Sequence, residues 1–153
     1  MPNEHTLPRD VSFFTLGYQS HTVKSFLRIL SANRVRVLVD VRQNPVSRKP
    51  GFSKRRLEKS VHARGLEYVH LPCLGTPSRI RKVYARTGNI QGALQQYEQH
   101  LRSNKQCLEY LLRRVTSRQF CLLCLETDHN SCHRSVIAQQ LTEMTGCQPI
   151  HLK

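Results

Sequence analysis

The chain is poor in acidic residues and lacks several features that define large classes of protein. Its 153 residues contain 10 aspartates and glutamates against 24 lysines and arginines, so the formal net charge at pH 7 is +14. No run of about 18 uncharged apolar residues occurs, so the sequence predicts no membrane-spanning helix. The first residues, MPNEHTLPRD, have no apolar stretch behind a positive end, so we expect no secretory signal.

Repeats, low-complexity segments and a regular cysteine spacing are also missing. Two of the six cysteines, Cys121 and Cys124, lie inside an apolar run where a buried thiol fits, so we expect no disulfide framework. The predicted location is therefore the cytoplasm. The length suits a single domain that buries a core, and we assign it to residues 11–153, with residues 1–10 as a flexible tail.

The excess of positive charge favours an anionic partner, above all nucleic acid or a nucleotide. Much of the charge is clustered between residues 48 and 64, and a second cluster lies between residues 79 and 86. No zinc finger, RNP motif or basic region with heptads accompanies these charge clusters. The alternative to nucleic-acid binding is that the clusters are ordinary solvated surface faces. The residues that we predict to contact nucleic acid are Arg48, Lys49, Lys54, Arg55 and Arg56.

Apolar runs rich in β-branched residues alternate with segments of helical periodicity. Strands are expected over residues 12–17, 35–41, 66–71, 120–125 and 147–152. Helices are expected from Ser20, from Ser53 to Gly65, over residues 90–101 and 106–116, and from Ser131 to a stop at Gly146. The segment 72–89 is expected to be irregular. This alternation predicts an α/β fold, with a mostly parallel sheet of about five strands flanked by helices in a Rossmann-like three-layer arrangement.

Polar residues follow the predicted strands, where sheets of this kind bind ligands. Asp40 is expected to act as a base or electrostatic stabiliser, and Arg42 as a fork for phosphate or carboxylate. The alternative for Asp40 is a structural role in which it caps backbone amides. If the strands are neighbours, Asp40 and Glu126 approach each other and supply both an acid and a base. Tyr18 and Ser47 are placed among the substrate-binding residues because each lies at the same edge.

The triplet Cys132-His133-Arg134 is expected at the first turn of a helix. Free amides and the helix dipole favour an anion there, so His133 and Arg134 are predicted to bind phosphate. A cysteine at that position has a depressed pKa, which makes Cys132 a candidate nucleophile. The tyrosine-phosphatase loop is excluded, because the sixth residue after Cys132 is Ala138 and not arginine.

A metal site is the third interpretation of this region. Cys124, His129, Cys132 and His133 lie within ten positions, and their spacing suits zinc. The adjacent Cys132 and His133 would project in different directions from a helix start. We therefore predict no bound metal and no other cofactor.

With these motifs assembled, the chain resembles the DUF488 family, which is named for having no settled function. The matching pieces appear in family order: LGYQS (16–20), VDVRQNPVS (39–47), GF (51–52), GLEYVHLPCLG (65–75) and CLETDHNSCHR (124–134). The resemblance implies an α/β domain whose site is formed by the Asp-x-Arg, Cys-x-Glu and Cys-His-Arg motifs. In this chain those motifs are Asp40, Arg42, Cys124, Glu126, Cys132, His133 and Arg134. One departure is Thr76, which stands where the family usually has a second glycine after Gly75.

Three functional hypotheses follow from these residues. The first is an enzyme that hydrolyses a nucleotide or nucleic acid, or transfers a group from it, with Asp40, Glu126 and Cys132 as catalytic residues. The second is a nucleic-acid-binding module without catalysis, in which the charge itself is the function. The third is a thiol-based redox protein centred on Cys132.

Overall fold

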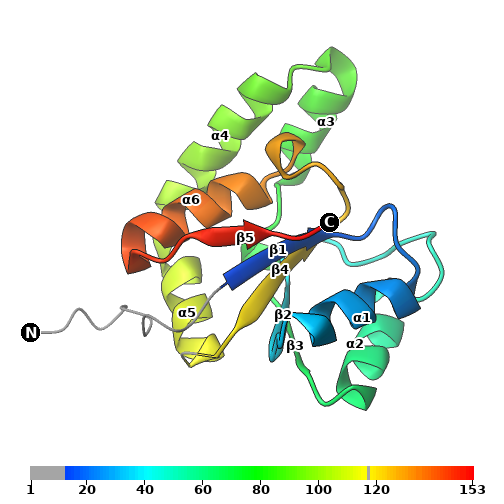
Figure 1. The fold of residues 1–153 in the computed structure, drawn as a ribbon. Coiled ribbons are helices and arrows are strands. Elements are labelled where there is room, and N and C mark those ends of the chain that lie inside the picture. The colour runs from blue at the N-terminus through cyan, green and yellow to red at the C-terminus, as the bar shows by residue number, and fades with distance from the viewer. Residues whose placement is uncertain (1–12, 117) are drawn as a thin grey trace, which may run out of the picture.

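The computed structural model describes residues 13–116 and 118–153, which place five parallel strands between two helical layers (Figure 1). The predicted α/β fold with a parallel sheet is confirmed, whereas the predicted tail over residues 1–10 lies outside the described residues. The sheet has the order β3-β2-β4-β1-β5. Its strands are β1 (Phe13–Gly17), β2 (Val37–Asp40), β3 (Glu67–His70), β4 (Phe120–Cys124) and β5 (Pro149–His151).

Helices cover both faces of the sheet. On one face, α1 (Val23–Ala32) and α2 (Lys54–Ala63) enclose one buried cluster, and on the other α4 (Ile90–Ser103), α5 (Lys105–Val115) and α6 (Arg134–Thr145) enclose a second (Figure 1). Because strand side chains alternate, Cys121 belongs to the first cluster and Cys124 to the second. Burial on both faces explains the continuous apolar runs in the sequence. Within residues 13–116 and 118–153, no helix is both long and apolar enough to cross a bilayer.

Two helix starts differ from the sequence-based expectation. Helix α1 is capped by Thr22, not Ser20, because Thr22 and Ser25 form a reciprocal capping box with N···O distances of 3.1 and 3.0 Å. Ser53 precedes α2 as predicted, but its hydroxyl closes the preceding loop, since it accepts from the Ser47 amide at 3.0 Å and donates to the Ser47 carbonyl at 3.1 Å. Gly146 ends α6 as expected.

The segment predicted to be irregular contains a short 3₁₀ turn, η1 (Pro72–Leu74), and a full helix, α3 (Ser78–Thr87). The sequence hides α3 because its only fully buried side chain is Ile80, and most of its other positions are polar or basic. Helix α3 instead depends on α4, against which it packs as a hairpin projecting beyond the sheet (Figure 1). Packing against α4 therefore stabilises α3, although the sequence of α3 lacks the apolar stripe that usually predicts a helix.

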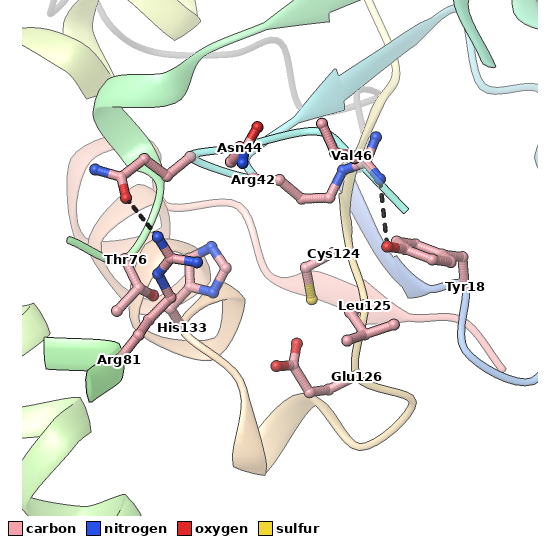
Figure 2. A pocket seen from close by; sticks show the side chains of 11 residues that line it. Tyr18, Arg42, Asn44, Val46, Thr76, Arg81, Cys124, Leu125, Glu126 and His133 are labelled. Atoms are coloured by element: carbon pink, nitrogen blue, oxygen red, sulfur yellow. Dashed lines mark hydrogen bonds between the residues drawn. The ribbon is translucent and has the colours of Figure 1, made fainter. Parts of the chain in front are cut away.

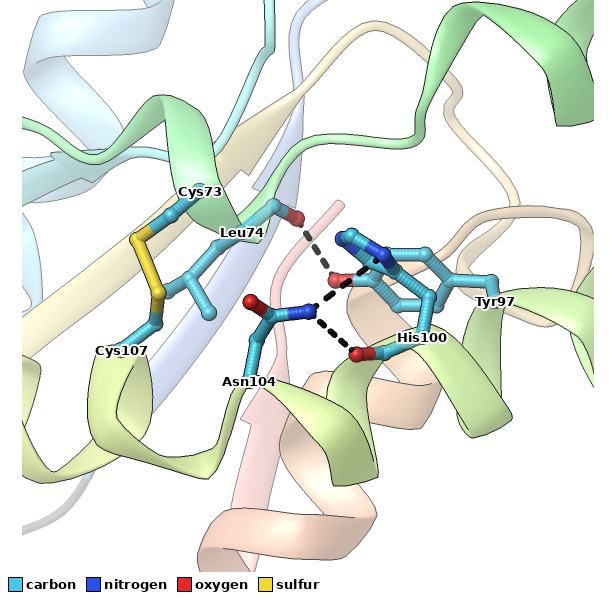
Figure 3. Close-up of a disulfide and its surroundings, with 6 residues drawn as sticks. All are labelled: Cys73, Leu74, Tyr97, His100, Asn104 and Cys107. Atoms are coloured by element: carbon cyan, nitrogen blue, oxygen red, sulfur yellow. Dashed lines mark hydrogen bonds between the residues drawn. A yellow bond between two sulfur atoms is a disulfide. The ribbon is translucent and has the colours of Figure 1, made fainter.

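A disulfide between Cys73 and Cys107 joins η1 to the start of α5, across 34 residues of sequence (Figure 3). Close by, the Tyr97 hydroxyl donates to the Leu74 carbonyl at 2.6 Å, which ties η1 to α4 as well (Figure 3). The expectation of no disulfide is wrong for this pair. Spacing in the sequence could not show the pairing, because two helices must pack before the sulfurs meet.

Candidate active site

A cavity of about 230 Å³ lies at the carboxyl edge of the sheet and is shared by loops far apart in the sequence (Figure 2). The loop after β2 and the loop after β4 form its walls, because β2 and β4 are neighbours with Asp40 opposite Leu123. The two segments expected to form one site therefore do meet. The residues that line the cavity are Tyr18, Arg42, Gln43, Asn44, Val46, Thr76, Arg81, Cys124, Leu125, Glu126 and His133.

Asp40 and Arg42 satisfy each other in a buried ion pair. Arg42 Nε donates to Asp40 Oδ1 at 2.8 Å and Arg42 Nη2 donates to Asp40 Oδ2 at 2.6 Å, while the Tyr68 hydroxyl also donates to Oδ2. Burial lowers the pKa of Arg42, but the Asp40 carboxylate outweighs it, so the pKa of Arg42 is raised and its charge is permanent. Asp40 has no exposed surface. The assignment of Asp40 as a catalytic residue is therefore corrected to a structural role.

The remaining hydrogen bonds of Arg42 fix it in the cavity wall. Its Nη1 donates to the Phe52 carbonyl at 2.7 Å. The same atom donates to the Tyr18 hydroxyl at 3.3 Å (Figure 2). The guanidinium fork that was predicted to bind phosphate is thus occupied by the Asp40 carboxylate, which also balances its charge. Tyr18 lines the cavity as predicted, with its ring stacked on Phe52 at 4.5 Å between centroids. Ser47 lies outside the cavity, because its backbone and hydroxyl hold the loop through Ser53 and Lys49.

Cys132 and His133 form a thiol–imidazole pair just before α6. His133 Nε2 lies 3.1 Å from the Val41 carbonyl, which can only accept, so Nε2 carries a proton. His133 Nδ1 lies 3.6 Å from Cys132 Sγ and is therefore free to take the thiol proton. A nucleophile, its base and a group that orients the base are the three parts of an activated cysteine.

The surroundings of Cys132 favour its thiolate. Burial alone raises the pKa of the Cys132 thiol, but the Cys124 thiol and the His133 ring lower it well below its ordinary value. The backbone amide of Arg134, at the start of α6, acts in the same direction, as predicted for a helix N-terminus. Burial also lowers the pKa of His133, and the Cys132 thiolate outweighs it, so that pKa is raised.

Glu126 faces the larger cavity (Figure 2). It does not pair with Asp40, whose carboxylate accepts hydrogen bonds from Arg42 and Tyr68. Burial raises the pKa of the Glu126 carboxyl, and the negative charge of Cys132 raises it further. The predicted Asp40–Glu126 dyad is therefore wrong: Asp40 is neutralised by Arg42, and the anionic neighbour of Glu126 is Cys132. A carboxyl with a raised pKa is suited to donate a proton.

Three groups here could hold a metal ion. Cys124 Sγ, Cys132 Sγ and a Glu126 carboxylate oxygen all lie within 4.8 Å of one another. Two sulfurs and one oxygen with an open fourth position fall within the range of zinc ligand sets. The set differs from the one considered in the sequence, since Glu126 takes the place of His129 and His133.

Arg134 is buried beneath the site and does not face the cavity. Its side chain has no exposed surface. Its Nη1 donates to Thr15 Oγ1 at 3.1 Å, and its Nη2 donates to the Glu126 carbonyl at 2.7 Å and to the Thr127 carbonyl at 3.0 Å. The predicted phosphate-binding role of Arg134 is therefore wrong, and Arg134 instead anchors the backbone that carries Glu126. Gly17 allows this loop to approach β1, because a Cβ there would lie 1.8 Å from the Glu126 carbonyl oxygen.

A second, smaller cavity of about 60 Å³ adjoins the first and gives access to Cys132. Thr76, Glu126 and His133 line both cavities. The walls that belong to the smaller one alone are mainly apolar: Ile80, Tyr84, Ile90, Ala93, Leu94 and Tyr97. Sequence reasoning missed these residues, and it also missed Arg81, whose Nη2 donates to Gln43 Oε1 at 2.9 Å, because α3 was not predicted.

The five basic residues predicted to contact nucleic acid lie together beside the site. Arg48, Lys49, Lys54, Arg55 and Arg56 line a groove of about 800 Å³ formed by the loop before α2 and its first turn. None of the four ion pairs found among the described residues involves them. Asn44 and Val46 line both this groove and the larger cavity, so the two are continuous.

Fold and site together define an α/β protein that carries a buried thiol–imidazole pair at the carboxyl edge of a parallel sheet. The family model described as Domain of unknown function DUF488 matches residues 22–141, so the chain belongs to the DUF488 family. The matched segment includes Arg42, Glu126 and the Cys132–His133 pair, whereas β1 precedes it. No curated protein and no solved structure matches the chain.

Proposed function

We propose that this protein is a cysteine-dependent hydrolase or transferase that acts on a nucleotide or nucleic acid. The observation that carries the proposal is Cys132 Sγ at 3.6 Å from His133 Nδ1, with Nε2 of the same ring held by the Val41 carbonyl. This arrangement prepares a thiolate with an oriented imidazole beside it. Glu126 adds a carboxyl of raised pKa in the same cavity.

The chemistry divides between Cys132 and Glu126. The Cys132 thiolate attacks an electrophilic carbon of the substrate, and the bond to the leaving group breaks. The leaving group keeps the bonding electrons and takes the proton of Glu126. In the second step, water or another acceptor gives a proton to the Glu126 carboxylate and attacks the same carbon, which expels the Cys132 thiolate and restores the protonated Glu126.

The substrate class follows from the two adjoining cavities and the charge of the chain. Arg81 places positive charge on the wall of the larger cavity, which is continuous with the basic groove, and this charge favours phosphate. Tyr84 and Tyr97 line the smaller, mainly apolar cavity beside Cys132, and the edge of a flat ring such as a nucleobase could reach this wall from the larger cavity that adjoins it. The net charge of +14 supports a polyanionic or phosphate-bearing partner.

Turnover of nucleosides, nucleotides and short oligonucleotides, followed by chromatography of the products, tests the proposal. Cys132→Ser and Glu126→Gln are each expected to reduce turnover by about 10²-fold or more. Cys147→Ser is the matched control, because Cys147 is a free thiol outside both cavities. Full turnover by Cys132→Ser would show that the Cys132 thiol takes no part in the reaction.

The pH profile of that turnover is a second readout of the same assignment. The active form needs Cys132 without its proton and Glu126 with its proton. Because the pKa of Cys132 is lowered, activity is expected to rise with pH well below the range of an ordinary thiol. Because the pKa of Glu126 is raised, activity is expected to decline only above the ordinary carboxyl range. Glu126→Gln should abolish the decline at high pH.

A second candidate function, nucleic-acid binding without turnover, is supported by the basic groove over Arg48–Arg56. Binding of a labelled single-stranded oligonucleotide, measured by anisotropy between about 50 and 200 mM salt, is expected to weaken steeply with salt. The double substitution Arg55→Ala and Arg56→Ala should lower the logarithmic salt slope by about 0.7 for each phosphate that the groove no longer neutralises.

Lys105→Ala with Arg113→Ala is the matched control for this measurement. It removes the same charge from exposed positions on α5, which covers the opposite face of the sheet. An equal loss of affinity in both double variants would mean that net charge matters and the groove does not. Binding without any turnover, with the slope sensitive to the groove, would favour the second candidate.

A further inference from the structure

Two of the free thiols among the described residues come close to each other. Cys124 and Cys132 are both in the cluster between the sheet and helices α4 to α6, and their sulfurs lie within 4.8 Å. Cys121, three residues before Cys124, points to the opposite face of the sheet. Cys73 and Cys107 are already joined to each other. The fold therefore selects one thiol pair from the six cysteines.

The two members of the pair are placed for different roles. Cys132 is at the end of the chain segment that leads into α6, where His133 and the first backbone amides of the helix favour its thiolate. Cys124 ends β4, and its buried sulfur lies next to that of Cys132. A thiolate is the form that reacts with peroxide, and a neighbouring thiol then resolves the product.

We infer that Cys132 and Cys124 form a redox-modification site, in which a hydroperoxide oxidises Cys132 and Cys124 closes an intramolecular disulfide. In the first step the Cys132 thiolate attacks one peroxide oxygen, and the O–O bond breaks to give a sulfenic acid and a hydroxide or alkoxide. In the second step Cys124 attacks that sulfur and water leaves. The sulfurs lose two electrons in total, and the hydroperoxide is reduced by the same two.

The geometry permits both steps. Cys132 lines the cavity of about 60 Å³ and Cys124 lines the one of about 230 Å³, so a molecule as small as hydrogen peroxide has space beside each sulfur. The sulfurs must close to about 2.05 Å for the bond to form. Five of the seven residues between them are exposed, and the short 3₁₀ turn over His129–Ser131 is the only helix there, so this loop can adjust.

The modification deepens the proposed function and partly rests on it, because a disulfide removes the nucleophile. Once Cys132 is bonded to Cys124, His133 Nδ1 loses its thiol partner, and the proposed covalent step cannot occur. Oxidation itself does not depend on what the substrate is. The chemistry of the pair can therefore be tested before any substrate is known.

The test is mass spectrometry of the full chain, treated first with a chelator and then with stoichiometric hydrogen peroxide and a thiol alkylating agent. Cleavage after Glu126 separates Cys121 and Cys124 from Cys132, so a disulfide appears as two linked peptides. The expected result is a Cys124–Cys132 link that dithiothreitol reverses. In Cys124→Ser the link is lost and Cys132 accumulates as a sulfenic acid that dimedone traps.

Matched controls and outcomes separate this inference from the proposed function. Cys121→Ser, on the same strand, and Cys147→Ser should form the link as the wild type does. If Cys124→Ser misfolds, Cys124→Ala serves in its place. Recovery of both thiols unmodified, or equal oxidation of all free cysteines, would overturn the inference. A parallel sample without chelator is oxidised in the same way, and thiols that a bound metal protects in that sample alone would also overturn it.

The two proposals fail in different ways. Turnover that depends on Cys132, without a disulfide after peroxide, would overturn only the redox site. The opposite result is a reversible Cys124–Cys132 disulfide in the wild type together with full turnover by Cys132→Ser. That result would overturn only the proposed enzymatic role. Where both proposals hold, peroxide is expected to stop turnover in the wild type, and dithiothreitol is expected to restore it.

Discussion

Arg42→Met is expected to lower the free energy of unfolding by about 3–5 kcal/mol, because it leaves the Asp40 carboxylate buried without its counter-charge. The pair is bidentate, and the side chains of Asp40 and Arg42 are 0% and 8% exposed. After the substitution, the Tyr68 hydroxyl and the backbone amide of residue 42 are the donors that remain for Asp40. Urea denaturation followed by circular dichroism measures the loss, since the chain has no tryptophan.

The control for this prediction is Arg114→Met. Arg114 pairs with Glu67 at 2.7 Å, but the two side chains are 43% and 28% exposed, so the expected loss is about 0–1 kcal/mol. Adding Asp40→Asn to Arg42→Met removes the orphaned charge and should recover part of the stability. Equal effects of Arg42→Met and Arg114→Met would show that burial does not set the strength of the first pair.

Arg134→Met is expected to cost on the order of 3 kcal/mol, because it removes a buried cation that donates to three oxygens. Two of those oxygens are the carbonyls of Glu126 and Thr127, so the loop that carries Glu126 should also loosen. The unfolding free energy is one readout. The rate of Cys132 alkylation is the second, because this thiol is only 2% exposed in the intact site.

Two variants calibrate the Arg134 result. Arg134→Lys keeps the charge but cannot reach three acceptors in a fixed fork, so an intermediate loss is expected. Arg86→Met, at an exposed position on α3, should change stability by no more than about 0.5 kcal/mol. The contradicting outcome is an Arg134→Met protein that is as stable as the wild type but has lost affinity for nucleotides. That result would support a phosphate-binding role for Arg134 despite its burial.

Local pattern was enough to predict most strands and helices. Val37–Asp40 and Phe120–Cys124 are apolar runs with a polar residue or loop directly behind them, and such runs are typical of strands covered on both faces. Helix α3 could not be predicted in this way, because its basic sequence has almost no apolar stripe. It packs against α4, and the sequence of α3 alone does not show that contact.

The charged residues of the site were harder to assign than the strands. Asp40 and Arg42 are two positions apart, and the sequence suggests a role toward a ligand for both, but they satisfy each other with help from Tyr68 and Phe52. Arg134 stands at a helix start, where an anion site was expected, but its side chain extends under the sheet edge to Thr15. In each case the deciding partner comes from a distant segment.

Local sequence pattern was sufficient to predict the α/β architecture, the edge of the sheet where the site lies, and the position of Cys132 and His133 next to the start of a helix. These features depend on residues a few positions apart, whose spacing sets which face each side chain takes. Three features follow only from the packing of distant segments: Asp40, Arg42 and Arg134 bond to other parts of the chain, Glu126 lies beside Cys132, and Cys124 is the thiol next to Cys132. A charged or nucleophilic group is available to a ligand only if no other part of the chain has already paired with it, and folding alone brings those parts together.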